Sequence, residues 1–146
     1  MIVKDVLDAI RRNGWPKIKN YYFEIVTDST VYGQSTRKTN YLGAFNKGAT
    51  PQITGACAFG QASLNLGVRI PQYNGVPEYF LDTEFGKALN DIPTPVFGNL
   101  DTELQTWDGY IRYLNDQTSM SLKEIADEVE SLLPSEALTR ELNIQT

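Results

Sequence analysis

A run of small residues in the middle of the chain, from Gly55 to Gly67, constrains the fold more than any other feature of the sequence. Glycine, alanine and serine recur through this run, and the apolar side chains of Phe59 and Leu64 lie between them. Small side chains allow another element to approach the backbone of a helix closely. We therefore predict a central packing helix over Gly55–Gly67, and we expect Gly67 to end it.

The spacing of apolar residues predicts the elements around this helix. Recurrence every three or four positions predicts an amphipathic helix, and alternation of aromatic or β-branched residues with polar ones predicts a strand. Before the central helix, these patterns predict a helix from Val3 to Ile10, a strand from Ile18 to Val26 and a more loosely paired strand from Thr39 to Phe45. After it, they predict a short helix from the N-cap Asp82 to Leu89, a helix from Leu100 to Leu114, and a helix that begins with the capping box of Ser121 and Glu124.

The length and composition of the chain are those of one globular domain. It has 146 residues, of which 41% are hydrophobic and 21% are charged. A chain of this length buries a sizeable core without disulfides or metal ions. We therefore expect residues 1–146 to form a single α+β domain, mainly helical, with a small antiparallel β-sheet.

The acidic charge balance disfavours nucleic acid as a partner. The formal net charge is -5 at pH 7 and the isoelectric point is about 4.7, so the chain has no overall attraction to phosphate backbones. Residues Ser121 to Val129 resemble the first helix of a helix-turn-helix, but Pro134 stands where a recognition helix should begin and no basic run follows. No apolar run is long enough to span a bilayer and the N-terminal residues lack a secretory pattern, so we expect a cytoplasmic protein without membrane contact.

The sequence contains no histidine. This removes the usual general base near neutral pH, the histidine-activated nucleophiles and the commonest transition-metal ligand. Neither a dinucleotide-binding pattern nor a phosphate-binding loop accompanies Gly55, Gly60 and Gly67. We therefore expect no cofactor and no metal ion, and we favour a non-enzymatic protein, although catalysis by carboxylate, lysine or tyrosine stays open.

Cys57 is the sole cysteine and lies near the start of the predicted central helix. The positive end of a helix dipole can lower a thiol pKa, which would make Cys57 a nucleophile. Its neighbours are small or apolar and no histidine is present to act as a base. We favour the alternative, in which Cys57 is a buried packing residue.

Two groups of residues are candidates for binding. Asn115 and Asp116 lie between two predicted helices, where their side chains would accept backbone N–H groups in a structural turn, with ligand binding as the alternative. Tyr21, Tyr32 and Tyr41 belong to a region rich in tyrosine and asparagine. Tyrosine provides a large contact area at little cost in conformational entropy, so these tyrosines either form a contact surface or cover the sheet.

Several short motifs occur in an order that is seen elsewhere. They are Gly14-Trp15, Cys57-Ala58-Phe59-Gly60, Leu114-Asn115-Asp116 and Ser121-Leu122-Lys123-Glu124-Ile125. This order resembles a family of small uncharacterised domains from actinobacteria and their phages, whose pattern is Gly-Trp, Cys-Ala-Leu-Gly-Ala and Trp-Asn-Asp. In this chain Gln61 stands in place of the last alanine and Leu114 in place of the tryptophan. The resemblance implies a compact, largely helical cytosolic domain of phage or bacterial origin, with no established activity.

Three functions are compatible with these features. The one we favour is a non-enzymatic binding protein, phage-encoded and directed at a host protein, whose contact surface is the region from Tyr21 to Phe45. The second is a small-molecule-binding or enzymatic domain that uses tyrosines and carboxylates in a cleft between the sheet and the helices. The third is a homo-oligomeric structural component. A concave pocket with converging polar groups is the feature expected of the second function.

Overall fold

The computed structural model describes residues 1–12, 14–30, 33–40, 52–68, 81–95 and 102–144. These residues form an α+β fold with five α-helices, two short 3-10 helices and a three-stranded antiparallel sheet in the order β2-β1-β3. In chain order the elements are α1 (Val3–Arg11), β1 (Phe23–Thr30), β2 (Gly33–Thr39), β3 (Ile53–Ala56), α2 (Ala58–Leu66), α3 (Leu81–Ala88), η1 (Thr102–Gln105), α4 (Trp107–Gln117), α5 (Leu122–Leu132) and η2 (Ser135–Thr139). The predicted fold class, mainly helical with a small antiparallel sheet, is confirmed.

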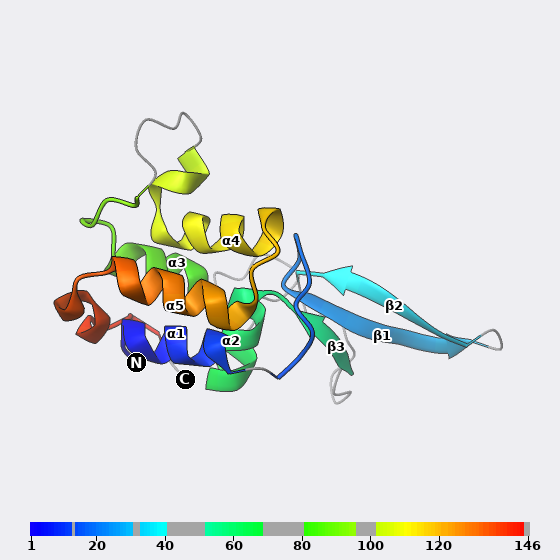
Figure 1. Ribbon diagram of the computed structural model, residues 1–146. Helices are drawn as coiled ribbons and strands as arrows, with labels where there is room; N and C mark the ends of the chain where they lie inside the picture. The colour runs from blue at the N-terminus through cyan, green and yellow to red at the C-terminus, as the bar shows by residue number, and fades with distance from the viewer. Residues whose placement is uncertain (13, 31–32, 41–51, 69–80, 96–101, 145–146) are drawn as a thin grey trace.

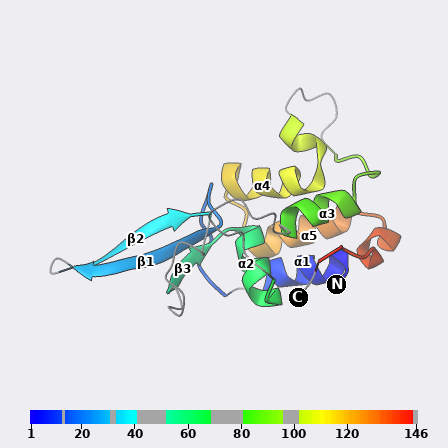
Figure 2. The same ribbon diagram turned by 180° about the vertical axis from the view of Figure 1, so that it is seen from behind.

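The helices form one body, from which β1 and β2 project as a two-stranded arm (Figure 1). Strand β1 pairs with β2 from Phe23 to Thr30, but its ladder with β3 runs only from Phe23 to Ile25. Helix α2 lies between the other helices and the sheet, as the view from behind also shows (Figure 2). The small-residue helix is therefore central, and it joins the two parts of the fold.

The core fills the space between the helices. The apolar face predicted for the first helix is fully buried, since Val3, Val6, Leu7 and Ile10 are each 0% exposed. Helix α1 packs against α2 on one side and against α5 on another. Burial of such a face is what stabilises a short helix that would be marginal alone in water.

The central helix begins later than predicted. Gly55 and Ala56 belong to β3, where they pair with β1, and Cys57 is the N-cap of α2. At the other end, Gly67 adopts the left-handed conformation with a φ of 65°, which confirms the predicted end of the helix.

The predicted strands are displaced along the sequence. The strand expected at Ile18–Val26 begins only at Phe23, because Asn20 has a φ of 71° and so interrupts the extended backbone. The second strand is Gly33–Thr39, not Thr39–Phe45, and residues 41–45 of that prediction lie outside the described residues. Its residues are almost all polar, so no apolar alternation indicates it.

The C-terminal helices follow the predictions in part. The first two residues of the helix expected at Leu100–Leu114 lie outside the described residues, and the rest is divided between η1 and α4, because Thr106 caps α4 by accepting the N–H of Gly109 at 3.2 Å. The capping box of the next helix is confirmed, with Ser121 and Glu124 each accepting the other's backbone N–H. Asp82 lies inside α3 rather than at its N-cap, which leaves its carboxylate available to contacts outside that helix.

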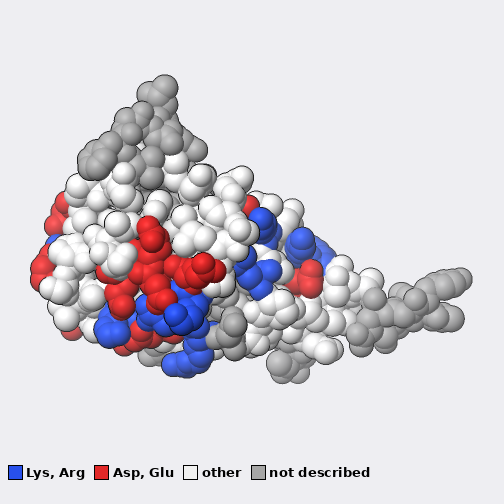
Figure 3. All heavy atoms as spheres, viewed as in Figure 1, with Lys and Arg blue, Asp and Glu red and all other residues white. Residues whose placement is uncertain are grey.

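Acidic and basic side chains lie side by side over α1 and α5 (Figure 3). Arg11 is at the centre of this cluster, 2.6 Å from Asp8, 2.8 Å from Asp127 and 3.3 Å from Glu130. These carboxylates are one-third to one-half exposed, so water and salt weaken each pair. The cluster links α1 to α5 at the surface and contributes little to the free energy of folding.

Candidate functional site

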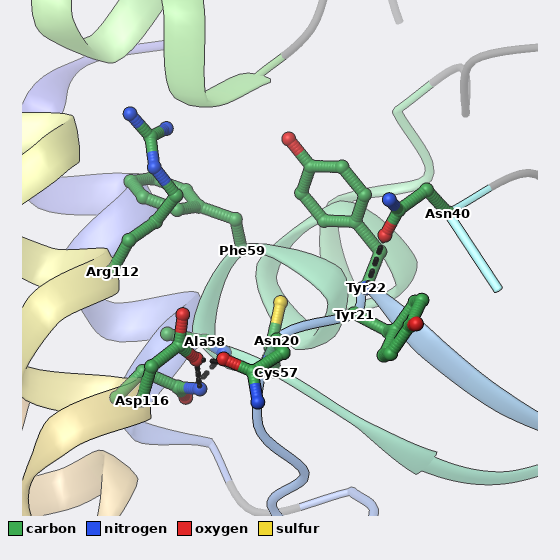
Figure 4. A pocket seen from close by; sticks show the side chains of 10 residues that line it. Asn20, Tyr21, Tyr22, Asn40, Cys57, Ala58, Phe59, Arg112 and Asp116 are labelled. Atoms are coloured by element: carbon green, nitrogen blue, oxygen red, sulfur yellow. Dashed lines mark hydrogen bonds between the residues drawn. The ribbon is translucent and has the colours of Figure 1, made fainter. Parts of the chain in front are cut away.

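A pocket of about 180 Å³ opens where the start of β1 meets α2 and α4. One side comes from Asn20 to Tyr22 and from Asn40, and the opposite side comes from the last turns of α4. The first residues of α2 lie between these two sides. Figure 4 shows the Cys57 sulfur pointing into the space between Arg112 on one side and Tyr22 on the other.

Hydrogen bonds from α4 hold the segment that precedes β1. The Asn115 amide donates to the Ile18 carbonyl at 2.9 Å, and the Asp116 carboxylate accepts the Asn20 N–H at 2.9 Å. On the other side, the Tyr22 N–H donates to the Asn40 side chain at 3.1 Å. These bonds explain how Asn20 is kept in a left-handed conformation that most residues avoid, although asparagine tolerates it.

Asn115 has a structural part in this arrangement. Its side chain is almost fully buried, its oxygen accepts the Ala58 N–H at 3.1 Å, and its amide also donates to Asp116 at 2.9 Å. The oxygen thereby satisfies one of the unpaired N–H groups at the start of α2. Both residues lie in the last turns of α4 and not in a turn between helices, so their predicted location is wrong.

Cys57 caps α2 and lines the pocket. Its N–H donates to the Tyr22 carbonyl at 3.0 Å, and its sulfur accepts the Gly60 N–H at 3.4 Å. Burial of the thiol, followed by the negative charges of Asp116 and Asp82, raises its pKa from 9.0 to about 12, although hydrogen bonds from the helix backbone act in the opposite direction. The thiol is therefore protonated at neutral pH, which argues against the nucleophile interpretation.

The pH dependence of alkylation tests this assignment. The rate of reaction of the folded protein with iodoacetamide is expected to be low at neutral pH and to rise about tenfold per pH unit up to about pH 10, because the thiolate fraction stays small below the raised pKa. The Cys57→Ser variant, which keeps a side-chain oxygen at the N-cap, should not react. A rate that levels off near neutral pH would mean that the thiol is activated.

A chain of polar contacts links the pocket to α3. The Tyr22 hydroxyl donates to Asp82, which is 6% exposed, and Arg112 donates to Asp82 at 3.0 Å and to Asp108 at 3.1 Å. Burial and the neighbouring Asp82 carboxylate raise the pKa of the Tyr22 hydroxyl, so the phenol stays protonated. Burial would lower the pKa of Arg112, but the ion pairs with Asp108 and Asp82 outweigh it and raise that pKa.

The residues proposed from the sequence are brought together only in part. Tyr21, which is 44% exposed, lines the pocket with Asn115 and Asp116. Tyr32 and Tyr41 lie outside the described residues.

Three residues of the site and its polar contacts were not identified as such from the sequence, and these are Arg112, Asp82 and Asn40. Arg112 alone has a usable signal in the sequence, because Asp108, Arg112 and Asp116 recur every four residues and therefore share one face of a helix.

The described residues give no sign of a metal centre, since they hold no group of three or more cysteine and acidic side chains placed to bind an ion. None of the helices in this part of the chain has the length and apolar character of a bilayer-spanning segment. No protein-family model matches the chain, and no curated protein or solved structure matches it. The function is therefore argued from the geometry of the pocket.

Proposed function

We propose that this chain is a non-enzymatic protein-binding module and that the pocket beside β1 is the centre of its contact surface. The observation that supports this most is the placement of Tyr21, a large aromatic side chain that is 44% exposed beside a concave site. An exposed tyrosine next to a pocket is typical of the residues that contribute most to protein interfaces. Asn20 and Asn40 add adaptable polar groups around it.

The size of the pocket favours a protruding side chain over a whole small molecule. Sites for drug-sized ligands usually enclose about 300–1,000 Å³, whereas this pocket encloses about 180 Å³. The arm of β1 and β2 projects from the helical body (Figure 1), and the pocket is lined by Tyr22 and Asn40, which adjoin the two strands at the base of the arm. The arm would therefore extend the contact area. A two-stranded ribbon is marginally stable alone, so a partner that packs on the arm would also stabilise it.

The chemistry of the site supports binding rather than catalysis. The Cys57 thiol and the Tyr22 hydroxyl both have raised pKa values and stay protonated near neutral pH. A thiol or phenol that acts as a nucleophile or general base near neutral pH needs a lowered pKa or an adjacent base. The Asp82 carboxylate accepts hydrogen bonds from Tyr22 and Arg112, and these bonds fix the positions of the three side chains.

We expect the protein to act in the cytoplasm, where its single thiol would stay reduced. On the favoured hypothesis a phage encodes this protein, and its partner is a protein of the host cell. A domain that binds a free small molecule is the second candidate, because a concave pocket with converging polar groups is present. Assembly into a homo-oligomer is a third and would appear as a multiple of the chain mass in solution.

Site-directed photo-crosslinking tests the proposal. A photoreactive phenylalanine analogue at position 21 is expected to give one discrete cross-linked product in cells of the natural host, because Tyr21 lies at the proposed interface. The same analogue at Tyr113 is the control, since that side chain is 38% exposed on α4 and is not among the lining residues. Equal products from both positions, or none from position 21, would contradict the proposal.

Alanine substitution separates an interface from a packing role. For this comparison the photoreactive analogue is placed on the arm of β1 and β2, so that position 21 is free to be changed. Tyr21→Ala should then abolish the cross-linked complex. It should change the free energy of unfolding by less than about 1 kcal/mol, because the side chain is half exposed. Tyr32→Ala and Tyr41→Ala extend the same comparison to the other predicted contact tyrosines. A fall in stability without loss of the complex would assign these tyrosines to packing.

A further inference from the structure

We propose, on the basis of the proposed function, that the pocket receives a basic side chain of the partner protein, the ammonium of a lysine or the guanidinium of an arginine. Three features of the pocket support this: the neutralised state of its arginine, the position of Asp116 and the aromatic side chains around it.

Arg112 does not make the pocket a site for anions. It is the sole basic residue among the described lining residues, and its guanidinium already donates to Asp82 at 3.0 Å and to Asp108 at 3.1 Å. Two carboxylates therefore offset its charge before any ligand arrives. An anionic ligand would have to compete with both of them.

Asp116 adds a further negative charge at the opposite end of the same wall. Its Oδ1 atom accepts from the Asn20 N–H and from the Asn115 amide, both at 2.9 Å. A carboxylate can accept about four hydrogen bonds, so these two contacts orient Asp116 and leave capacity for a cation. Lys17 also interacts electrostatically with Asp116. Its ammonium donates to the Met120 carbonyl at 2.6 Å, so this hydrogen bond goes to the backbone and not to the Asp116 carboxylate.

Aromatic side chains complete the site. Tyr21, Tyr22 and Phe59 line the pocket, and Figure 4 shows Tyr21 and Asp116 on opposite sides of Asn20. The face of an aromatic ring attracts a cation, and a nearby carboxylate adds to this attraction. The aliphatic stem of a lysine or arginine would pack on the same rings.

The charges around the Cys57 thiol agree with this assignment. The Cys57 thiol points into the pocket, and after burial the next causes that raise its pKa include the charges of Asp116 and Asp82. The same two carboxylates would attract a cation that lay beside this thiol.

Titration with matched amino-acid probes, followed by amide chemical shifts in NMR spectra, tests the inference. The probes are N-acetyl-lysine N-methylamide, its neutral norleucine analogue and its anionic glutamate analogue. The lysine probe is expected to shift the amides of Asn20, Tyr22 and Ala58 in a saturable way, at least about tenfold more tightly than the other two. Asp116→Asn should weaken the lysine probe by a similar factor, because asparagine keeps an oxygen for the Asn20 N–H but loses the charge.

Glu141→Gln is the matched control, since it removes one negative charge from an exposed position outside the pocket. It should leave binding of the lysine probe unchanged. Equal binding of the norleucine probe, or tighter binding of the glutamate probe, would overturn the choice of a cation and leave the binding pocket itself intact. A fourth probe, n-butylamine, represents a free amine, and its tighter binding than that of the lysine probe would overturn the choice of a protein side chain. No shift with any of the four probes would overturn both the inference and the pocket as a contact site.

Discussion

Gly60→Ala is expected to lower the free energy of unfolding by about 3 kcal/mol, at the upper end of what overpacking costs. A Cβ atom at this position would lie 2.2 Å from the Tyr22 carbonyl oxygen and 3.1 Å from its carbon. These are backbone atoms, and the Cys57 N–H holds the same carbonyl at 3.0 Å, so they have little room to move. The substitution would push α2 away from the start of β1, and a leucine at position 60 should prevent folding.

Urea denaturation measures the change in the free energy of unfolding, and the sign of this change distinguishes a steric clash from an effect of helix propensity. Helix propensity alone would make alanine about 1 kcal/mol more favourable than glycine inside α2. Gly14→Ala is the matched control, because its Cβ would lie 3.7 Å from the Asn65 and Gln61 side-chain oxygens, which is ordinary contact. If Gly60→Ala were as stable as the wild type, α2 would not pack on Tyr22 as described.

Asn115→Leu is expected to lower the free energy of unfolding by about 3 kcal/mol. Leucine has a similar volume, but it leaves the Ala58 N–H and the Ile18 carbonyl without the partners that Asn115 provides. An unpaired buried group costs about 1–3 kcal/mol. The same substitution removes one of the two hydrogen bonds that orient Asp116, so binding of the lysine probe should weaken even where the chain stays folded.

Gln117→Leu provides the control for Asn115→Leu. Gln117 is exposed two residues later in α4, so its replacement should change stability by less than about 0.5 kcal/mol. Thermal and urea unfolding of both variants, measured together, give the comparison. A stable Asn115→Leu variant would contradict the structural role, because it would show that the hydrogen bonds of Asn115 to Ala58 and Ile18 do not stabilise the fold.

The helices were more predictable than the strands because their signals are local. The buried face of α1 and the capping box of α5 are both complete within a few residues of sequence. Strand β2 carries no such signal, because it is a polar strand that lies at the edge of the sheet beside β1. The start of β1 depends on hydrogen bonds from α4, more than 90 residues away along the chain.

The candidate site was predictable only where residue type and helix spacing agree. Asn115 and Asp116 were singled out as polar residues near a helix end, but their roles differ, because one is buried and bonded to α2 while the other lines the pocket with its charge. Gln61 shows the same difficulty. Its fully buried amide accepts from the Gly14 N–H at 2.9 Å and donates to the Trp15 carbonyl at 2.7 Å, a role that no pattern in the sequence indicates.

The pocket is built before any ligand binds if the segment from Asn20 to Tyr22 is rigid in the free protein. Backbone ¹⁵N relaxation of the unliganded chain measures this directly. Because Asp116 and Asn40 hold the two ends of the segment, order parameters of about 0.85 are expected at Asn20 and Tyr22, as in a regular helix. Values below about 0.6 would show that the segment is flexible and that the pocket does not exist in advance of its ligand.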